Sequence, residues 1–199
     1  PRERRGLVEL FPDYWSWALA VRFCEGSVRK AAHSAREALE LADVALAIAE
    51  RVPGGEGWRS RLTGYCWAHA GNARRVANDY AGADEAFARA WDLWRAGADA
   101  EALLPEWRLF DLEASLRRDQ RRLSQALELL DRARAGCGAD PLAIGRVLLK
   151  KVHVLDAMGE HESTLAALKE AAPFVEDSGN RRLLFTLRFN LTANLCQLE

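Results

Sequence analysis

Apolar residues recur at three- and four-residue intervals along most of this chain, mixed with alanine, glutamate, arginine and leucine. The pattern is clearest over residues 31–51, 83–96 and 123–135. This spacing places apolar side chains on one face of an α-helix. The alternation that marks a β-strand never extends beyond a few residues. The pattern therefore predicts an all-α protein.

Short segments rich in turn-forming residues separate the helical runs. They lie at residues 53–57, 97–99, 136–138 and 178–180. Helices joined by such short connections pack as antiparallel neighbours. Asp140 and Pro141 together are typical of a helix start, and Gly159 is typical of a helix end.

One stretch of the chain carries a repeat motif with specific spacing. Its members, in order, are Trp67, Ala70, Gly71, Tyr80, Ala83, Phe87 and Ala90. Their order and spacing resemble the consensus of the tetratricopeptide repeat family, whose members stack antiparallel helix pairs into a solenoid. The resemblance implies that Gly71 and Ala83 let two helices approach closely, while Trp67, Tyr80 and Phe87 fill the space between them.

The same register recurs towards the C-terminus, around Ala126 and more weakly around Thr164. The spacing between successive positions, from Ala83 to Ala126 and from Ala126 to Thr164, exceeds the family's repeat length of roughly 34 residues. This indicates extended helices or loops. The predicted tetratricopeptide-like region covers residues 53–199, with repeats at about 64–97, 107–140 and 145–178 and a half repeat at 185–199. Residues 1–52 are interpreted as a degenerate N-terminal helical repeat, with 12–25 as its first helix.

These repeats together predict an antiparallel helix-pair solenoid. By resemblance to the family, it would be a single continuous right-handed superhelix. We interpret the chain as a fragment of a longer protein, because it begins at Pro1 and stops in the middle of a repeat pattern.

Charge and cysteine content narrow the classes of partner and location. The 28 basic and 29 acidic residues nearly cancel and are interspersed, so no nucleic acid partner is expected. No apolar run is long enough to cross a bilayer, so no membrane partner is expected either. The four cysteines lie far apart, which favours buried thiols and a cytoplasmic protein.

The sequence contains no phosphate-binding loop, nucleophile elbow or dinucleotide fingerprint, and its four histidines have no paired ligand spacing. We therefore expect no enzymatic activity, no cofactor and no metal. The seven tryptophans could pack the core or form a binding surface, and core packing is favoured. The arginines within 117–122 could form a nucleic-acid patch, but a solvated turn is favoured.

Family resemblance places the binding site on the inner wall of the solenoid, which the first helix of each repeat builds. In this register the candidate protein- or peptide-binding residues are Asn72, Arg75, Arg108, Arg146, Lys150, His153 and Asn190. This wall is basic and polar, which predicts a scaffold for an acidic or carboxylate-bearing protein or peptide. Charge reversal at Arg146 and Lys150 is expected to weaken binding without disturbing the fold. The alternative is a sensor or regulatory module of a larger bacterial transcriptional or signalling protein.

The last predicted helix has no partner helix within the chain. Its apolar face, from Phe185 to Leu195, is therefore expected to stay uncovered. Dimerisation or crystal packing through this face is the expected consequence.

Overall fold

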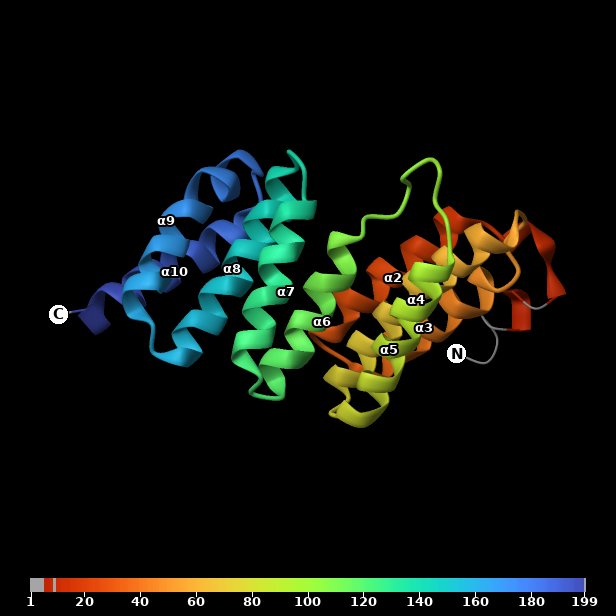
Figure 1. The fold of residues 1–199 in the computed structure, drawn as a ribbon, viewed down its shortest axis with the longest axis horizontal. Coiled ribbons are helices and arrows are strands. Elements are labelled where there is room, and N and C mark those ends of the chain that lie inside the picture. The colour runs from red at the N-terminus through yellow and green to blue at the C-terminus, as the bar shows by residue number, and fades with distance from the viewer. Residues whose placement is uncertain (1–5, 9, 199) are drawn as a thin grey trace. The chain divides into compact units, whose positions relative to one another are not determined.

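The computed structural model describes residues 6–8 and 10–198 of the chain. Over these residues the structure is helical and contains no β-strand (Figure 1), which confirms the all-α prediction. The chain divides into two compact units, Pro1–Leu104 (unit 1) and Pro105–Glu199 (unit 2). Residues 1–5 and 9 of the predicted N-terminal repeat, and residue 199 of the last half repeat, lie outside the described part.

Unit 1 contains two antiparallel helix pairs. Its elements are a 3-10 turn η1 (Pro12–Tyr14) and the α-helices α2 (Trp17–Ala31), α3 (Ala35–Ala49), α4 (Glu56–Val76) and α5 (Tyr80–Ala96). Helix α2 packs on α3, and α4 packs on α5. The pairs are joined because α4 also packs against both α3 and α2. The two first helices, α2 and α4, are therefore direct neighbours.

Two helix boundaries in unit 1 differ from the sequence prediction. Residues 31–51 do not form one helix, because the chain breaks after Ala31 and restarts at Ala35. Ser34 caps the new helix, since its hydroxyl accepts a hydrogen bond from the Glu37 N–H at 3.2 Å. The helix predicted to begin at Pro12 begins instead at Trp17, because Pro12 starts a separate 3-10 turn.

Helices α4 and α5 approach closely along a line of small residues. Ala83 and Ala90 are fully buried on α5. A Cβ atom on Gly71 of α4 would lie only 2.9 Å from the Phe87 ring. These contacts are those that the repeat motif predicts. Tyr80 is an exception, because it opens α5 and keeps 37% of its surface exposed instead of filling the space between the helices.

Unit 2 is built from antiparallel neighbours in the same way and has five helices over its described residues. They are α6 (Trp107–Asp119), α7 (Leu123–Gly136), α8 (Pro141–Met158), α9 (His161–Asp177) and α10 (Arg181–Leu198). Each helix packs on the next, and α8 also contacts α6 and α10 (Figure 1). The first helices α6, α8 and α10 therefore line up as one layer, with α7 and α9 in the other.

The predicted start and end of α8 are both confirmed. The Asp140 carboxylate accepts a hydrogen bond from the Leu142 N–H at 2.9 Å, and Pro141 occupies the first turn. Gly159 ends the helix with φ of +77°, a conformation that glycine adopts without steric cost. Local sequence therefore sets both boundaries of this helix.

The tryptophans divide between the core and the surface. Trp94 is buried, with 4% of its surface exposed. Trp67 is only partly buried, and its ring contacts two arginines, with the Arg89 guanidinium 4.4 Å and the Arg74 guanidinium 5.3 Å from the ring centroid. Trp17 is exposed and meets Trp58 edge to face. The prediction that the tryptophans pack the core is therefore confirmed for Trp94. Trp67 is only partly in the core, and Trp17 is exposed.

Candidate functional site

The layer formed by α6, α8 and α10 carries five of the predicted binding residues. They are Arg108 on α6, Arg146, Lys150 and His153 on α8, and Asn190 on α10. Two contacts between polar side chains connect the three helices across one face of this layer. The Lys150 ammonium lies 2.6 Å from the Asp111 carboxylate of α6, and His153 Nε2 lies 3.2 Å from Asn190 Nδ2. We call this face of unit 2 the inner wall.

Asp111 is the centre of the polar contacts on the inner wall. Its side chain is completely buried, and its carboxylate lies 2.8 Å from Arg108 Nη1 and 2.6 Å from Lys150 Nζ. Lys150 also donates a hydrogen bond to the Asp111 backbone carbonyl at 2.9 Å. A buried carboxylate of this kind needs compensating charge, and two helices supply it here. Asp111 therefore fixes α8 against α6.

The surrounding charges keep Asp111 ionised. Burial raises the pKa of the Asp111 carboxyl, but the positive charges of Lys150 and Arg108 outweigh burial and hold the pKa below its ordinary value. Arg146 contributes in the same direction. Asp111 is thus a permanent negative charge at neutral pH.

Two further arginines lie on the inner wall beside these pairs. Arg118, near the end of α6, pairs with its neighbour Asp119 at 2.7 Å. Arg146 lies on the exposed side of α8. The wall therefore carries four basic side chains, those of Arg108, Arg118, Arg146 and Lys150.

His153 adds a neutral polar group beside these cations. Partial burial lowers the pKa of His153, and the positive charges of Arg118 and Lys150 lower it further against the opposing charge of Asp156. The imidazole is therefore uncharged at neutral pH. It can exchange a hydrogen bond with Asn190, so that α10 joins the polar surface of α8.

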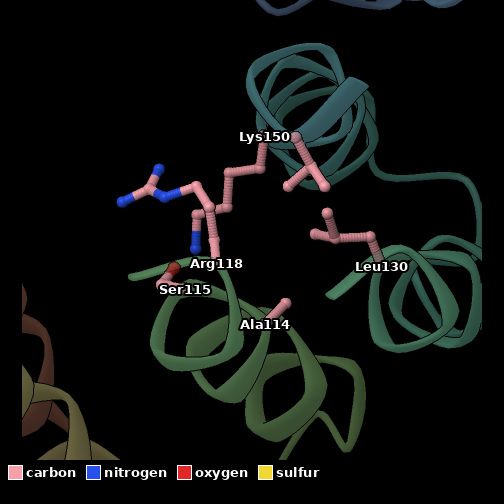
Figure 2. A pocket seen from close by; sticks show the side chains of 6 residues that line it. Ala114, Ser115, Arg118, Leu130 and Lys150 are labelled. Carbon is pink, nitrogen blue, oxygen red and sulfur yellow. The ribbon is translucent and has the colours of Figure 1, made fainter. Parts of the chain in front are cut away.

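A small hollow opens on the inner wall beside Lys150. Its lining is Ala114, Ser115, Arg118, Leu130, Lys150 and Val154, and its empty volume is about 160 Å³ including open solvent. Figure 2 shows the Lys150 side chain reaching from α8 towards α6, where it ends near Ser115 and Arg118. Pockets for drug-sized ligands enclose ~300–1,000 Å³. The hollow is therefore too small to enclose such a ligand, and the wall presents an open surface.

The remaining two predicted binding residues lie on α4, in unit 1. Asn72 is buried, with 3% of its surface exposed. Its side-chain carbonyl accepts hydrogen bonds from Arg75 Nε at 3.2 Å and Arg75 Nη2 at 3.1 Å. Asn72 thus orients Arg75 within its own helix, and neither residue belongs to the inner wall of unit 2.

The arginines of residues 117–122 are engaged locally or exposed at a turn. Arg117 donates hydrogen bonds to Glu113 and Gln120. Arg121 has φ of +62° and is exposed, as expected in a tight turn between α6 and α7. These contacts support the interpretation as a solvated turn.

The described residues contain neither a cluster suited to a metal ion nor a helix suited to a membrane. No group of three histidine, cysteine, aspartate or glutamate side chains there could hold a metal ion. Over the same part of the chain, none of the helices is both long and apolar enough to span a membrane.

Comparison with known proteins identifies the fold. No protein-family model matches this chain, and no curated protein matches it. It is similar to the crystal structure of a Podosopora anserina protein described as a kinesin light chain with nearly identical TPR-like repeats. The two share 13% sequence identity with a TM-score of 0.57, over 92% of this chain and 98% of the other.

The fold is that of tetratricopeptide-like repeats. This confirms the resemblance inferred from the repeat motif and the prediction of an antiparallel helix-pair solenoid. At this level of identity the similarity concerns the fold alone. That the helix pairs of the two units continue as one solenoid stays a prediction.

Proposed function

We propose that this chain is a protein-binding scaffold, and that the inner wall of unit 2 binds an acidic segment of a protein or peptide. The observation that supports this most is the charge arrangement around Asp111. Ion pairs hold Lys150 and Arg108 on one face, while Arg146 stays exposed beside them. A ligand carboxylate would therefore meet cations that are already oriented.

The shape of the inner wall favours an extended ligand. Polar side chains follow one another from α6 across α8 to α10, and the hollow between them is too small to enclose a small molecule. A peptide could contact all three helices without entering a deep pocket. Repeat folds commonly act as non-catalytic scaffolds of this kind. A scaffold function is therefore favoured over an enzymatic one.

Arg146 is the best position for a test of this proposal. Charge reversal at Lys150 would place two carboxylates together at a buried site, so the earlier expectation of an undisturbed fold does not suit this residue. Arg146 is exposed, so Arg146→Glu should keep the helical fold, with a small loss of stability because the Arg146 charge also favours ionised Asp111. Lys169→Glu on α9 is the matched control, because it makes the same charge change at an exposed position of a second helix.

We expect Arg146→Glu to weaken binding about tenfold or more, and Lys169→Glu to leave it nearly unchanged. Ligands would be found on an array of acidic, neutral and basic peptides and measured by isothermal titration calorimetry. Binding to the wild type should weaken with added salt. Preference for basic or neutral peptides, or equal effects of the two variants, would contradict the proposal.

We also propose that the chain self-associates through α10. Phe185, Phe189 and Leu195 are exposed by 71%, 64% and 50%, and the two phenylalanine rings stack with centroids 6.5 Å apart. Clustered apolar side chains of this size commonly mark interaction surfaces.

A Phe185→Ser/Phe189→Ser variant should stay monomeric at concentrations where the wild type forms dimers in size-exclusion chromatography with light scattering. Met158→Ser, at another exposed apolar residue, should still dimerise. A wild type that is monomeric at all concentrations would contradict this.

Other parts of the functional interpretation stay predictions. They are the cytoplasmic location, the lack of a nucleic acid partner and the alternative of a sensor or regulatory module in a larger bacterial protein. The inner-wall experiment does not depend on any of them.

A further inference from the structure

Two cysteines from different helices meet in the core of unit 1. Cys24 lies on α2 and Cys66 on α4, and their Sγ atoms are 3.6 Å apart. Both residues are fully buried, and both are thiols in this structure. They are 42 positions apart in the sequence, so the packing of the two first helices brings them together.

The distance between the two thiols is close to that needed for a disulfide. A disulfide requires a separation of ~2.05 Å, so the sulfur atoms would have to move together by roughly 1.5 Å. Rotation about the two Cα–Cβ bonds or a small shift of one helix can supply this. Helices α2 and α4 already pack directly on one another. The two thiols are therefore in contact across this helix interface before any bond forms.

The other two cysteines differ from this pair. Cys137 in unit 2 donates its thiol hydrogen to the Ala133 carbonyl at 3.2 Å. Burial, and after it the negative charge of Asp111, raises the pKa of Cys137 to about 11, which suppresses its reactive thiolate form. Cys196 is exposed on α10. Oxidation of these two residues would not link helices within unit 1.

We propose that Cys24 and Cys66 form a dithiol site that peroxides oxidise to a disulfide between α2 and α4. One thiolate attacks a peroxide oxygen, which gives a sulfenic acid and releases one water after protonation. The second thiol then attacks the sulfenic sulfur and expels another water. In balance, two thiols lose two protons and two electrons, and hydrogen peroxide becomes two water molecules.

The Cys24–Cys66 disulfide would restrict the partial unfolding of unit 1. It would tie the first helices of two successive pairs and would prevent α2 from separating from α4 in partial unfolding. Because both thiols are buried, the reaction needs brief local opening, so it should be slow and selective for small oxidants. This redox site goes beyond the proposed scaffold function and does not depend on it.

A variant that keeps only this pair provides the test. Cys137→Ser preserves a donor for the Ala133 carbonyl, and Cys196→Ser changes an exposed side chain. The folded double variant would be treated with hydrogen peroxide, then unfolded and labelled with N-ethylmaleimide. We expect both labels to be lost together, with a mass decrease of two hydrogen atoms and a cross-linked peptide that contains Cys24 and Cys66. Dithiothreitol should restore both labels.

Cys66→Ala in the same background is the control, and its remaining thiol should form no intramolecular link. The oxidised pair should lower the unfolded fraction of unit 1 by roughly a few hundred-fold in urea titrations followed by tryptophan fluorescence. Three results would overturn the proposal. The first is full labelling of both cysteines after peroxide treatment of the folded protein. The others are disulfides between molecules, or a Cys24–Cys66 disulfide that forms only when the protein is unfolded before peroxide is added.

Discussion

Replacement of Asp111 by alanine is expected to destabilise unit 2 by about 3–5 kcal/mol, because it leaves Lys150 and Arg108 without their buried partner. The loss would be measured by urea unfolding followed by circular dichroism. The next lysine of α8 offers a matched control. Lys151 lies 2.6 Å from Asp131, the same distance as Lys150 from Asp111, but the Asp131 side chain is 60% exposed.

Asp131→Ala is expected to reduce stability by about 1 kcal/mol or less, because solvent screens an exposed pair. The two variants thus compare the stability contributions of two ion pairs that have the same distance, one with a buried aspartate and one with an exposed aspartate. Similar losses in both would mean that the Asp111 contacts stabilise unit 2 no more than a surface pair does.

The stability difference between wild type and Asp111→Ala should also depend on pH. The pKa of Asp111 is lowered in the folded state, so its ionic contribution is fully present above the ordinary carboxyl pKa of ~3.9. It is lost as the pH falls through the lower, folded-state pKa. The difference should therefore be constant near neutral pH and shrink in acid below about pH 4.

Gly64→Ala is expected to destabilise unit 1 by about 1–3 kcal/mol, although alanine is the better helix former by ~1 kcal/mol. A Cβ atom at residue 64 would lie 2.8 Å from the Ala90 carbonyl oxygen and 2.9 Å from the Trp94 nitrogen. These are backbone atoms of α5, so the substitution can fit only if the two helices separate. Urea unfolding followed by tryptophan fluorescence would measure the loss.

Gly26→Ala on α2 is the control for this prediction. A Cβ atom there would meet Leu41 Cδ1 at 3.5 Å, an ordinary contact. Helix propensity should then dominate, and stability should be unchanged or higher by up to about 1 kcal/mol. Destabilisation by Gly26→Ala, or none by Gly64→Ala, would contradict this account of the α4–α5 packing.

The fold could be predicted from the sequence because local patterns carry most of its information. The three- and four-residue spacing of apolar residues predicted the helices, and small residues such as Ala83 and Gly71 predicted where two of them approach. Tyr80 was predicted wrongly. Its place in the motif cannot show that a tyrosine at the first position of α5 keeps its ring partly in solvent.

The candidate site could be predicted only in part. The repeat register placed Arg108, Arg146 and Lys150 on one face, which agrees with their placement on α6 and α8. The sequence did not predict that Asp111 is buried and pairs with both Arg108 and Lys150, because an aspartate in a polar pattern is ordinarily exposed. A signal was present, since Arg108 lies three residues before Asp111 on the same helix and can pair with it.

The sequence by itself determined the helices, most of their boundaries and the pairing of neighbours, because periodicity, caps and short connections act within a few residues. Only the tertiary structure decided which polar groups meet. Lys150 binds Asp111, which is 39 positions away in the sequence, and Cys24 contacts Cys66, which is 42 positions away. Such contacts depend on how helices lie across one another, and a difference of one turn in that packing would separate every one of these pairs.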